Sequence, residues 1–166
     1  MNETSRQAGE QFLPDEEATL RFAARMARNL PQSKQPFVLY LQGDLGTGKT
    51  TLTRGMLRQL GERGAVRSPT YGLIAEYATP SGAVLHLDLY RLRSPRELQQ
   101  LGLADYLPGS RLWLIEWPEL AEGEGLPPAD AQILLGVAGQ GRGLTIRAVS
   151  PQGGRWLRDL DADTGS

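Results

Sequence analysis

Apolar residues recur at helical spacing in two stretches of the chain. From Asp15 to Asn29 they follow a period of about 3.6 residues, and Asp15 is placed to cap a helix whose first turn is acidic. A second helix is expected after Lys49, because four apolar residues there share one helical face: Leu52, Met56, Leu57 and Leu60. Gly61 and Gly64 follow and are placed to end this helix.

Short apolar or β-prone runs predict the strands. The run Phe37–Leu41 follows the breaker segment 31–36, and its composition is typical of a strand buried on both faces. Three further strands are expected, with a short helical patch after Pro95 between the last two: Leu73–Tyr77, Ala83–Leu89 and Arg111–Glu116. Gly-rich turns divide the C-terminal part into three more expected strands: Gln132–Val137, Leu144–Val149 and Arg155–Leu160.

This alternation predicts an α/β fold with a mixed β-sheet, flanking helices and antiparallel C-terminal edge strands. The length of 166 residues fits one domain, which we place at residues 13–160. Residues 1–12 are expected to form a flexible lead-in, and residues 161–166 a frayed tail.

Composition narrows the classes of protein that the chain can represent. Lys and Arg number 18 and Asp and Glu 19, so the formal net charge of −1 lacks the basic character typical of proteins that wrap nucleic acid. The absence of cysteine excludes disulfides and thiolate metal sites. No apolar stretch approaches the ~20 residues of a membrane span, and the N-terminus lacks a secretion signal, so we expect a soluble, cytoplasmic protein.

The segment Gly43–Thr50 reads Gly-Asp-Leu-Gly-Thr-Gly-Lys-Thr and matches a phosphate-binding loop. Its glycines allow a tight turn that directs backbone N–H groups at phosphate oxygens, Lys49 adds a cation, and the Thr50 hydroxyl can reach Mg²⁺. A chain of this composition would match by chance in about 1–2% of cases. Since the match lies between an expected strand and an amphipathic helix, we expect a P-loop NTPase-like fold that binds a nucleoside triphosphate with magnesium.

Two acidic residues close expected strands and offer the carboxylate that a magnesium nucleotide site needs. Asp88 ends a run that His86 interrupts, whereas Glu116 ends an uninterrupted apolar run and is slightly favoured. Each acid alone also fits a surface carboxylate, and the lone His86 fits a hydrogen-bonded structural histidine. Alternation places His86, Asp88 and Tyr90 on one face of their strand. Three nearby arginines are also compatible with a solvated face: Arg91, Arg93 and Arg96.

Together these motifs resemble the TsaE (YjeE) family, small bacterial ATPases required for threonylcarbamoyladenosine (t6A) modification of tRNA. The resemblance extends from about Leu13 to Leu160. It rests on five segments in the family's order and spacing: residues 43–51, Arg54-Gly55, Ser68-Pro69-Thr70-Tyr71, residues 86–92 and Glu116-Trp117-Pro118. The sequence departs from the family at Gly72, where the family has a threonine.

The resemblance implies roles for individual residues. Lys49, Asp88 and Glu116 are the expected catalytic residues, with Asp88 near the reacting phosphate. Thr50 and Glu116 are the expected Mg²⁺ ligands, and residues 68–70 are expected to act like a switch, although the residues alone indicate only a Ser-Pro turn. The residues expected to bind ATP are Glu16, Asp44, Leu45, Gly46, Thr47, Gly48, Lys49, Thr50, Thr51, Thr70 and Trp117.

The resemblance also implies an ATP-hydrolysing subunit that acts with the TsaB and TsaD proteins and reaches tRNA indirectly, through their complex. No residue stands out as a base for the attacking water, so slow, partner-dependent hydrolysis is expected. Two alternatives stay open: a small-molecule kinase with the arginines as a lid, and a nucleotide-gated binding module with incidental hydrolysis. A GTPase is disfavoured because no Asn-Lys-x-Asp segment occurs to read guanine.

Overall fold

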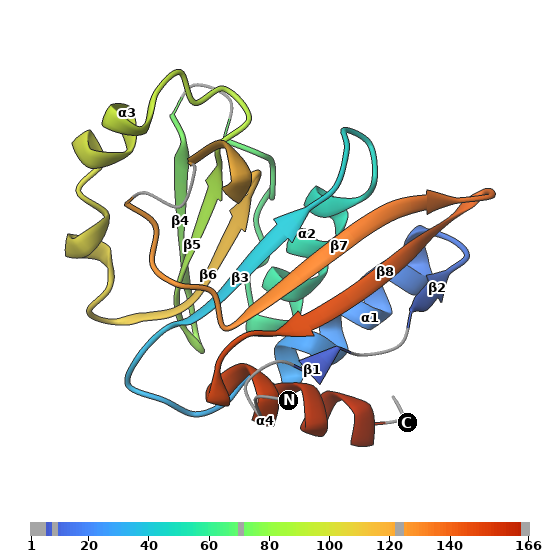
Figure 1. Cartoon of the computed structure of the whole chain (residues 1–166). Coiled ribbons are helices and arrows are strands. Elements are labelled where there is room, and N and C mark those ends of the chain that lie inside the picture. The colour runs from blue at the N-terminus through green and yellow to red at the C-terminus, as the bar shows by residue number, and fades with distance from the viewer. Residues whose placement is uncertain (1–5, 8–9, 70–71, 122–124, 164–166) are drawn as a thin grey trace.

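The computed structural model describes residues 6–7, 10–69, 72–121 and 125–163. Its strands are β1 (Arg6–Gln7), β2 (Gln11–Leu13), β3 (Phe37–Gln42), β4 (Ile74–Thr79), β5 (Gly82–Asp88), β6 (Ser110–Glu116), β7 (Ala131–Ala138) and β8 (Gly141–Ala148). They form one mixed sheet in the order β1-β8-β7-β3-β6-β5-β4, with β2 also paired to β8 (Figure 1). The central pairs β7–β3, β3–β6 and β6–β5 are parallel, and the remaining pairs are antiparallel.

Helices cover both faces of this sheet. On one face pack α1 (Glu16–Arg28), α2 (Lys49–Leu60) and α4 (Pro151–Ala162) (Figure 1). The other face is covered in part by α3 (Pro95–Gln100) and by the 3-10 helices η1 (Leu103–Tyr106) and η2 (Pro118–Ala121). The predicted α/β fold with a mixed sheet and flanking helices is confirmed.

Strand β3 shows why its sequence is apolar at successive positions. Leu39 and Leu41 pack into the core with α1 and α2, whereas Val38 and the half-buried Tyr40 pack into the core on the opposite face. Alternate side chains of a strand point to opposite faces, so a strand covered on both sides needs apolar residues throughout. This central position fixes the point where the loop after β3 leaves the sheet.

The closeness of α1 and α2 depends on Gly55. A Cβ atom at this position would lie 2.6 Å from the Cβ of Ala23 and 3.1 Å from the backbone oxygen of Leu20. Helices approach this closely only where one of them lacks a side chain, because packed interiors leave no room for an extra methyl group. The contact holds α2, which carries the start of the predicted site, against α1.

The segment 155–160, which we expected to be a strand, is instead part of helix α4. The Ser150 hydroxyl caps this helix by accepting a hydrogen bond from the Gly153 N–H group at 2.9 Å, and Pro151 occupies its first turn. Gly153 fits because a Cβ there would lie 1.9 Å from the Asp130 backbone oxygen. The buried residues at the end of the segment follow helical spacing: Trp156, Leu157 and Leu160.

Both ends of the chain contribute elements where the structure describes them. Residues 6–7 and 11–13 pair with β8. Residues 161–162 form the end of α4. Pairing with β8 and inclusion in α4 give the backbone groups of these residues hydrogen-bond partners. A segment of a few residues does not reveal such partners.

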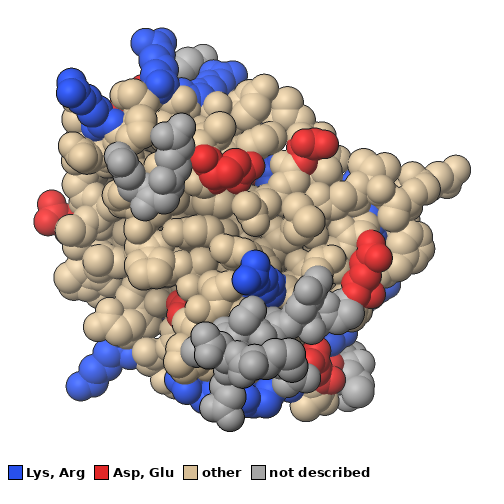
Figure 2. Space-filling view, in the orientation of Figure 1, with Lys and Arg blue, Asp and Glu red and all other residues tan. Residues whose placement is uncertain are grey.

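The surface carries charges of both signs. Figure 2 shows basic and acidic side chains scattered over one face of the molecule, at its edges and toward its middle. This scatter agrees with the formal net charge of −1. Among the described residues, no helix has both the length and the apolar character needed to cross a bilayer.

Candidate functional site

The predicted loop connects β3 to α2 at the edge of the sheet where parallel strands β3, β5 and β6 end. Gly43, Gly46 and Gly48 have φ angles of 145°, 78° and 102°, a region that side-chain-bearing residues rarely adopt. A Cβ at Gly43 would lie 2.4 Å from the Leu135 backbone oxygen, whereas one at Gly46 or Gly48 would meet no atom within 4 Å beyond its neighbours in the chain. The loop is therefore anchored at its start and borders open space further along.

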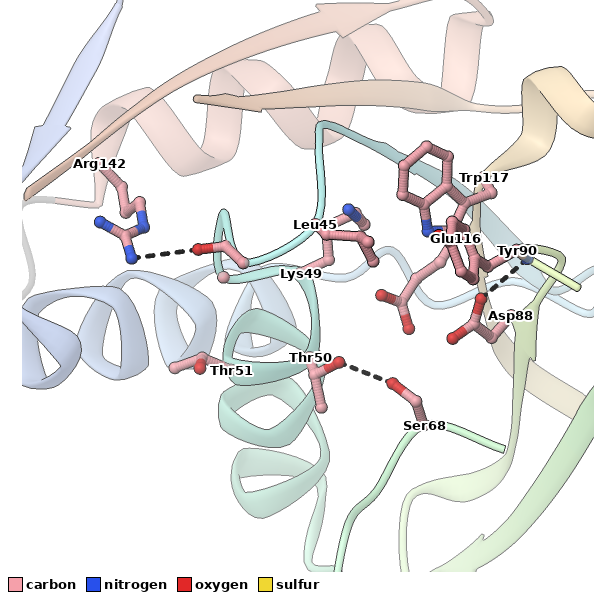
Figure 3. Close-up of a pocket in the computed structure, with 12 residues that line it drawn as sticks. Leu45, Lys49, Thr50, Thr51, Ser68, Asp88, Tyr90, Glu116, Trp117 and Arg142 are labelled. Carbon is pink, nitrogen blue, oxygen red and sulfur yellow. Dashed lines mark hydrogen bonds between the residues drawn. The ribbon is translucent and has the colours of Figure 1, made fainter. Parts of the chain in front are cut away.

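A pocket of about 310 Å³ adjoins this loop (Figure 3). It is lined by the loop, the first turn of α2, the ends of β5 and β6, and single residues from elsewhere: Leu45, Gly46, Gly48, Lys49, Thr50, Thr51, Ser68, Asp88, Tyr90, Glu116, Trp117 and Arg142. Helix α2 begins at Lys49, and the Gly48 that precedes it provides no side-chain cap. The backbone N–H groups of the first helical turn are thus free of a capping side chain, an arrangement that favours an anion.

Lys49 lies at the centre of this arrangement and is only 5% exposed. Its Nζ donates hydrogen bonds to the backbone oxygens of Gly43 and Asp44, the latter at 2.9 Å, and lies 4.4 Å from the centroid of the Trp117 ring. Burial lowers the pKa of the Lys49 ammonium, while the nearby charges, that of Glu116 foremost, act to raise it. The pocket thus holds a cation beside acidic residues.

The two acids that end β5 and β6 lie side by side, because the parallel register pairs Asp88 with Glu116. Glu116 is buried, and Asp88 is partly exposed and accepts a hydrogen bond from the Tyr90 N–H group at 3.0 Å. Burial raises the pKa of the Asp88 carboxyl, and the charge of Glu116 adds to the increase, whereas the Tyr90 N–H group opposes it. Asp88 therefore holds a proton more readily than an ordinary aspartate.

Two hydroxyl groups complete the opposite side of the pocket. The Oγ1 atom of Thr50 lies 2.7 Å from the Oγ atom of Ser68, and Figure 3 shows the carboxylates of Asp88 and Glu116 pointing toward this pair. Hydroxyl and carboxylate oxygens are the donors that Mg²⁺ prefers, and it usually takes one or two protein carboxylates together with phosphate oxygens. The described residues contain no cluster of three or more acidic or histidine ligands. A magnesium nucleotide site does not require such a cluster, because phosphate oxygens provide further ligands.

Trp117 follows Glu116 directly in the chain and also lines the pocket. Its φ angle of 59° is positive, and its backbone N–H donates to the Leu41 backbone oxygen at 3.3 Å. The indole ring packs against the ring of Tyr90, with centroids 5.1 Å apart, as well as against Lys49. A bulky residue in the left-handed region is strained, and such strain is concentrated at functional sites.

The predicted site residues fall into four groups. Those brought together in the pocket are Leu45, Gly46, Gly48, Lys49, Thr50, Thr51, Asp88, Glu116 and Trp117. The side chain of Thr47 is buried and donates to the Asp44 backbone oxygen at 2.8 Å, and neither residue lines the pocket. Glu16 lines a neighbouring pocket of about 150 Å³, which also includes Thr51, and forms an ion pair with Arg54. Thr70 lies outside the described residues.

Arg142 is a pocket residue that the sequence did not indicate. It lies on β8, and its Nη2 donates to the Gly46 backbone oxygen at 3.1 Å (Figure 3). No local pattern marks it, because its position near the loop depends on the pairing of β8 with β7 and of β7 with β3. It adds a second cation to the pocket wall.

Comparison with known proteins finds relatives over most of the chain. Residues 13–143 match the family model described as threonylcarbamoyl adenosine biosynthesis protein TsaE. A protein of Haemophilus influenzae named tRNA threonylcarbamoyladenosine biosynthesis protein TsaE is 45% identical over 129 residues, covering 76% of this chain and 80% of that protein. A Bacillus subtilis protein of the same name is 42% identical over 113 residues, covering 68% of this chain and 70% of that one. A crystal structure of Bacillus subtilis YdiB matches with a TM-score of 0.78 and 32% identity, over 95% of this chain and 96% of that chain.

Proposed function

The chain belongs to the TsaE family, and on this premise we propose that it is an ATP-hydrolysing subunit required for t6A modification of tRNA. One observation carries the proposal: the loop, the Thr50 hydroxyl and the strand-end carboxylates of Asp88 and Glu116 line one pocket. In this role the chain acts with the TsaB and TsaD proteins, and tRNA is held by the complex. The near-neutral charge of the chain fits that division of labour.

The loop residues bind the phosphates of ATP. Backbone N–H groups around Gly46 and Gly48 and the ammonium of Lys49 offset the phosphate charge, and Thr50 and Glu116 would hold Mg²⁺. Bound there, Mg²⁺ supplies stabilisation of the charge that develops on the phosphate oxygens. ATP is favoured over GTP because the sequence lacks an Asn-Lys-x-Asp segment.

Asp88 positions the attacking water. Its carboxylate lies beside Glu116 in the strand register and lines the pocket, and its raised pKa favours a hydrogen bond from water. A carboxylate is nevertheless a weak base, and Asp88 already accepts a hydrogen bond from the Tyr90 N–H group. The isolated chain therefore hydrolyses ATP slowly, and the partners accelerate turnover by completing the site.

Capture of TsaB and TsaD on the immobilised chain tests this function. We expect retention with ATP, weaker retention with ADP or without nucleotide, and loss of the difference in Lys49→Ala. The sequence has one other lysine, Lys34, and it is exposed. Lys34→Ala is therefore the matched control and should behave like wild type. Equal retention of both partners under all three conditions, or retention of neither, contradicts the proposal.

The need for hydrolysis itself is tested with two further variants. Asp88→Ala and Glu116→Ala remove the acids beside the loop and should abolish turnover while ATP still binds. If hydrolysis drives the complex, these variants fail to restore t6A in cells that lack the native protein. Full restoration by a variant that binds but does not hydrolyse ATP would show a nucleotide-gated binding module instead.

A kinase is the second function with structural support. A hollow of about 550 Å³ adjoins the pocket and shares Leu45, Ser68, Asp88 and Tyr90 with it, and Arg91 and Arg93 are among its other lining residues. A small molecule that accepts the γ-phosphate of ATP would fit in this hollow, beside the cationic side chains of Arg91 and Arg93. Incubation of γ-labelled ATP with a metabolite extract distinguishes the two: release of free phosphate supports the ATPase, and a labelled metabolite supports the kinase.

A further inference from the structure

His86 is the one histidine of the chain and is completely buried. It lies on β5, two residues before Asp88, and its side chain faces the same side of the sheet as that of Glu116. Its Nε2 atom lies 2.5 Å from the Oε2 atom of Glu116, whose side chain is 3% exposed. A polar group of the core is thus bonded directly to an acid of the candidate site.

The surroundings of the imidazole ring determine which nitrogen carries the proton. The Nδ1 atom is buried and has no hydrogen-bond partner among the residues that the structure describes. With the proton on Nδ1, the Nε2 lone pair would face the Glu116 carboxylate oxygen with no proton between them, and the Nδ1–H group would have no acceptor among the described residues. The proton therefore belongs on Nε2, which donates it to the Glu116 carboxylate.

We infer that His86 is a positioning residue that fixes the Glu116 carboxylate for Mg²⁺, an inference that rests on the proposed function of the site. With Oε2 held by His86, Oε1 is the oxygen available to a cation in the pocket. Glutamate has three side-chain torsions, and the bond to a buried ring selects one arrangement of them. Residues that orient a metal ligand in this way typically change metal affinity 10–100-fold when they are lost.

The tautomer is tested first, on the nucleotide-free wild-type protein. Long-range proton–nitrogen spectra of a ¹⁵N-labelled sample report which ring nitrogen is protonated, and the single histidine makes the assignment unambiguous. We expect the Nε2–H form. Observation of the Nδ1–H form would overturn the inference, whether or not the protein binds ATP.

Metal affinity is tested second. We expect His86→Leu to raise the Mg²⁺ concentration needed for half-maximal ATP binding by about 10–100-fold, with little change in ATP affinity in EDTA. His86→Gln retains a side-chain N–H donor and should recover most of the loss. Leu157→Ala, a core truncation in α4, is the control for general destabilisation and should leave the Mg²⁺ requirement unchanged.

The possible outcomes distinguish a failure of the role of His86 from a failure of the proposed ATPase function. If wild type shows no Mg²⁺-dependent ATP binding, the proposed function fails. If wild type requires Mg²⁺ but His86→Leu responds like wild type or like Leu157→Ala, the function stands and the role of His86 is refuted. Equal losses of ATP affinity with and without Mg²⁺ in His86→Leu would assign a purely structural role to the ring and also refute the inference.

Discussion

Trp117 combines backbone strain with side-chain contacts, and two substitutions separate these effects. It is the one non-glycine residue with a positive φ in the described part of the chain, at 59°. Trp117→Ala and Trp117→Gly both remove the ring contacts with Tyr90 and Lys49, which lie at 5.1 and 4.4 Å. The two variants differ in how well the new residue tolerates the left-handed backbone and in how much freedom it has in the unfolded chain.

The expected difference follows from two opposing energies. Alanine in the left-handed region costs about 1–2 kcal/mol, which glycine avoids. Glycine loses roughly 0.4–1 kcal/mol through the greater freedom of the unfolded chain. We therefore expect Trp117→Gly to be more stable than Trp117→Ala by about 0.5–1 kcal/mol, or about 1–4 °C in Tm for a domain of this size. Both variants should be less stable than wild type, because aromatic and cation–π contacts contribute about 0.5–2 kcal/mol each.

Thermal and urea unfolding followed by circular dichroism measure the difference. Lys34→Ala and Lys34→Gly provide the control pair, since Lys34 is exposed and lacks a positive φ. There the alanine variant should equal or exceed the glycine variant in stability. If alanine is also the more stable replacement at position 117, the left-handed backbone there carries no strain, contrary to this prediction.

Three further predictions concern packing, charge and the pocket wall. Gly55→Ala should lower the free energy of unfolding by about 1–2 kcal/mol through overpacking, and adding Ala23→Gly to the same chain should restore part of that loss. If urea unfolding shows that the effects of the two substitutions simply add, the two residues do not press on each other. Asp88→Asn should raise Tm at neutral pH, because the folded protein holds this carboxyl at a raised pKa and ionisation costs stability there. The gain in Tm should shrink as the pH falls toward 3.8, the ordinary pKa of aspartate. A gain in Tm that stays constant or grows at low pH would contradict the raised pKa of Asp88. Arg142→Ala should weaken ATP binding about tenfold in calorimetry through loss of its bond to the Gly46 backbone, and unchanged affinity would remove Arg142 from the site.

Local sequence patterns predicted the elements that surround the site. The Asp15 cap is confirmed by its 2.7 Å bond to the Ala18 N–H group, and Gly61 ends α2 in the left-handed conformation. The pattern was misread at residues 155–160, where Gly153 and Gly154 looked like a turn although Ser150 and Pro151 begin a helix. Glycine pairs usually weaken helices, and here the Ser150 cap and the burial of Trp156, Leu157 and Leu160 override that tendency.

Contacts between distant segments could not be read from the sequence. The two acids were recognised because each ends its own strand, but their adjacency depends on the register of β5 and β6. The bond between His86 and Glu116 and the approach of Arg142 to the loop depend on the same kind of non-local pairing. The spacing of residues within a segment identifies candidate site residues, and the pairing of strands in the sheet determines which of these residues lie close together.

Calorimetric titration of ATP into the purified chain, with and without Mg²⁺, shows whether the loop pocket is an ATP site. We expect binding that Mg²⁺ strengthens, at least about tenfold weaker binding by Lys49→Ala, no change in Lys34→Ala, and much weaker binding of GTP. Lys49→Ala that binds Mg²⁺–ATP as tightly as wild type, or wild type that binds neither nucleotide, would contradict the assignment of the loop pocket as the ATP site.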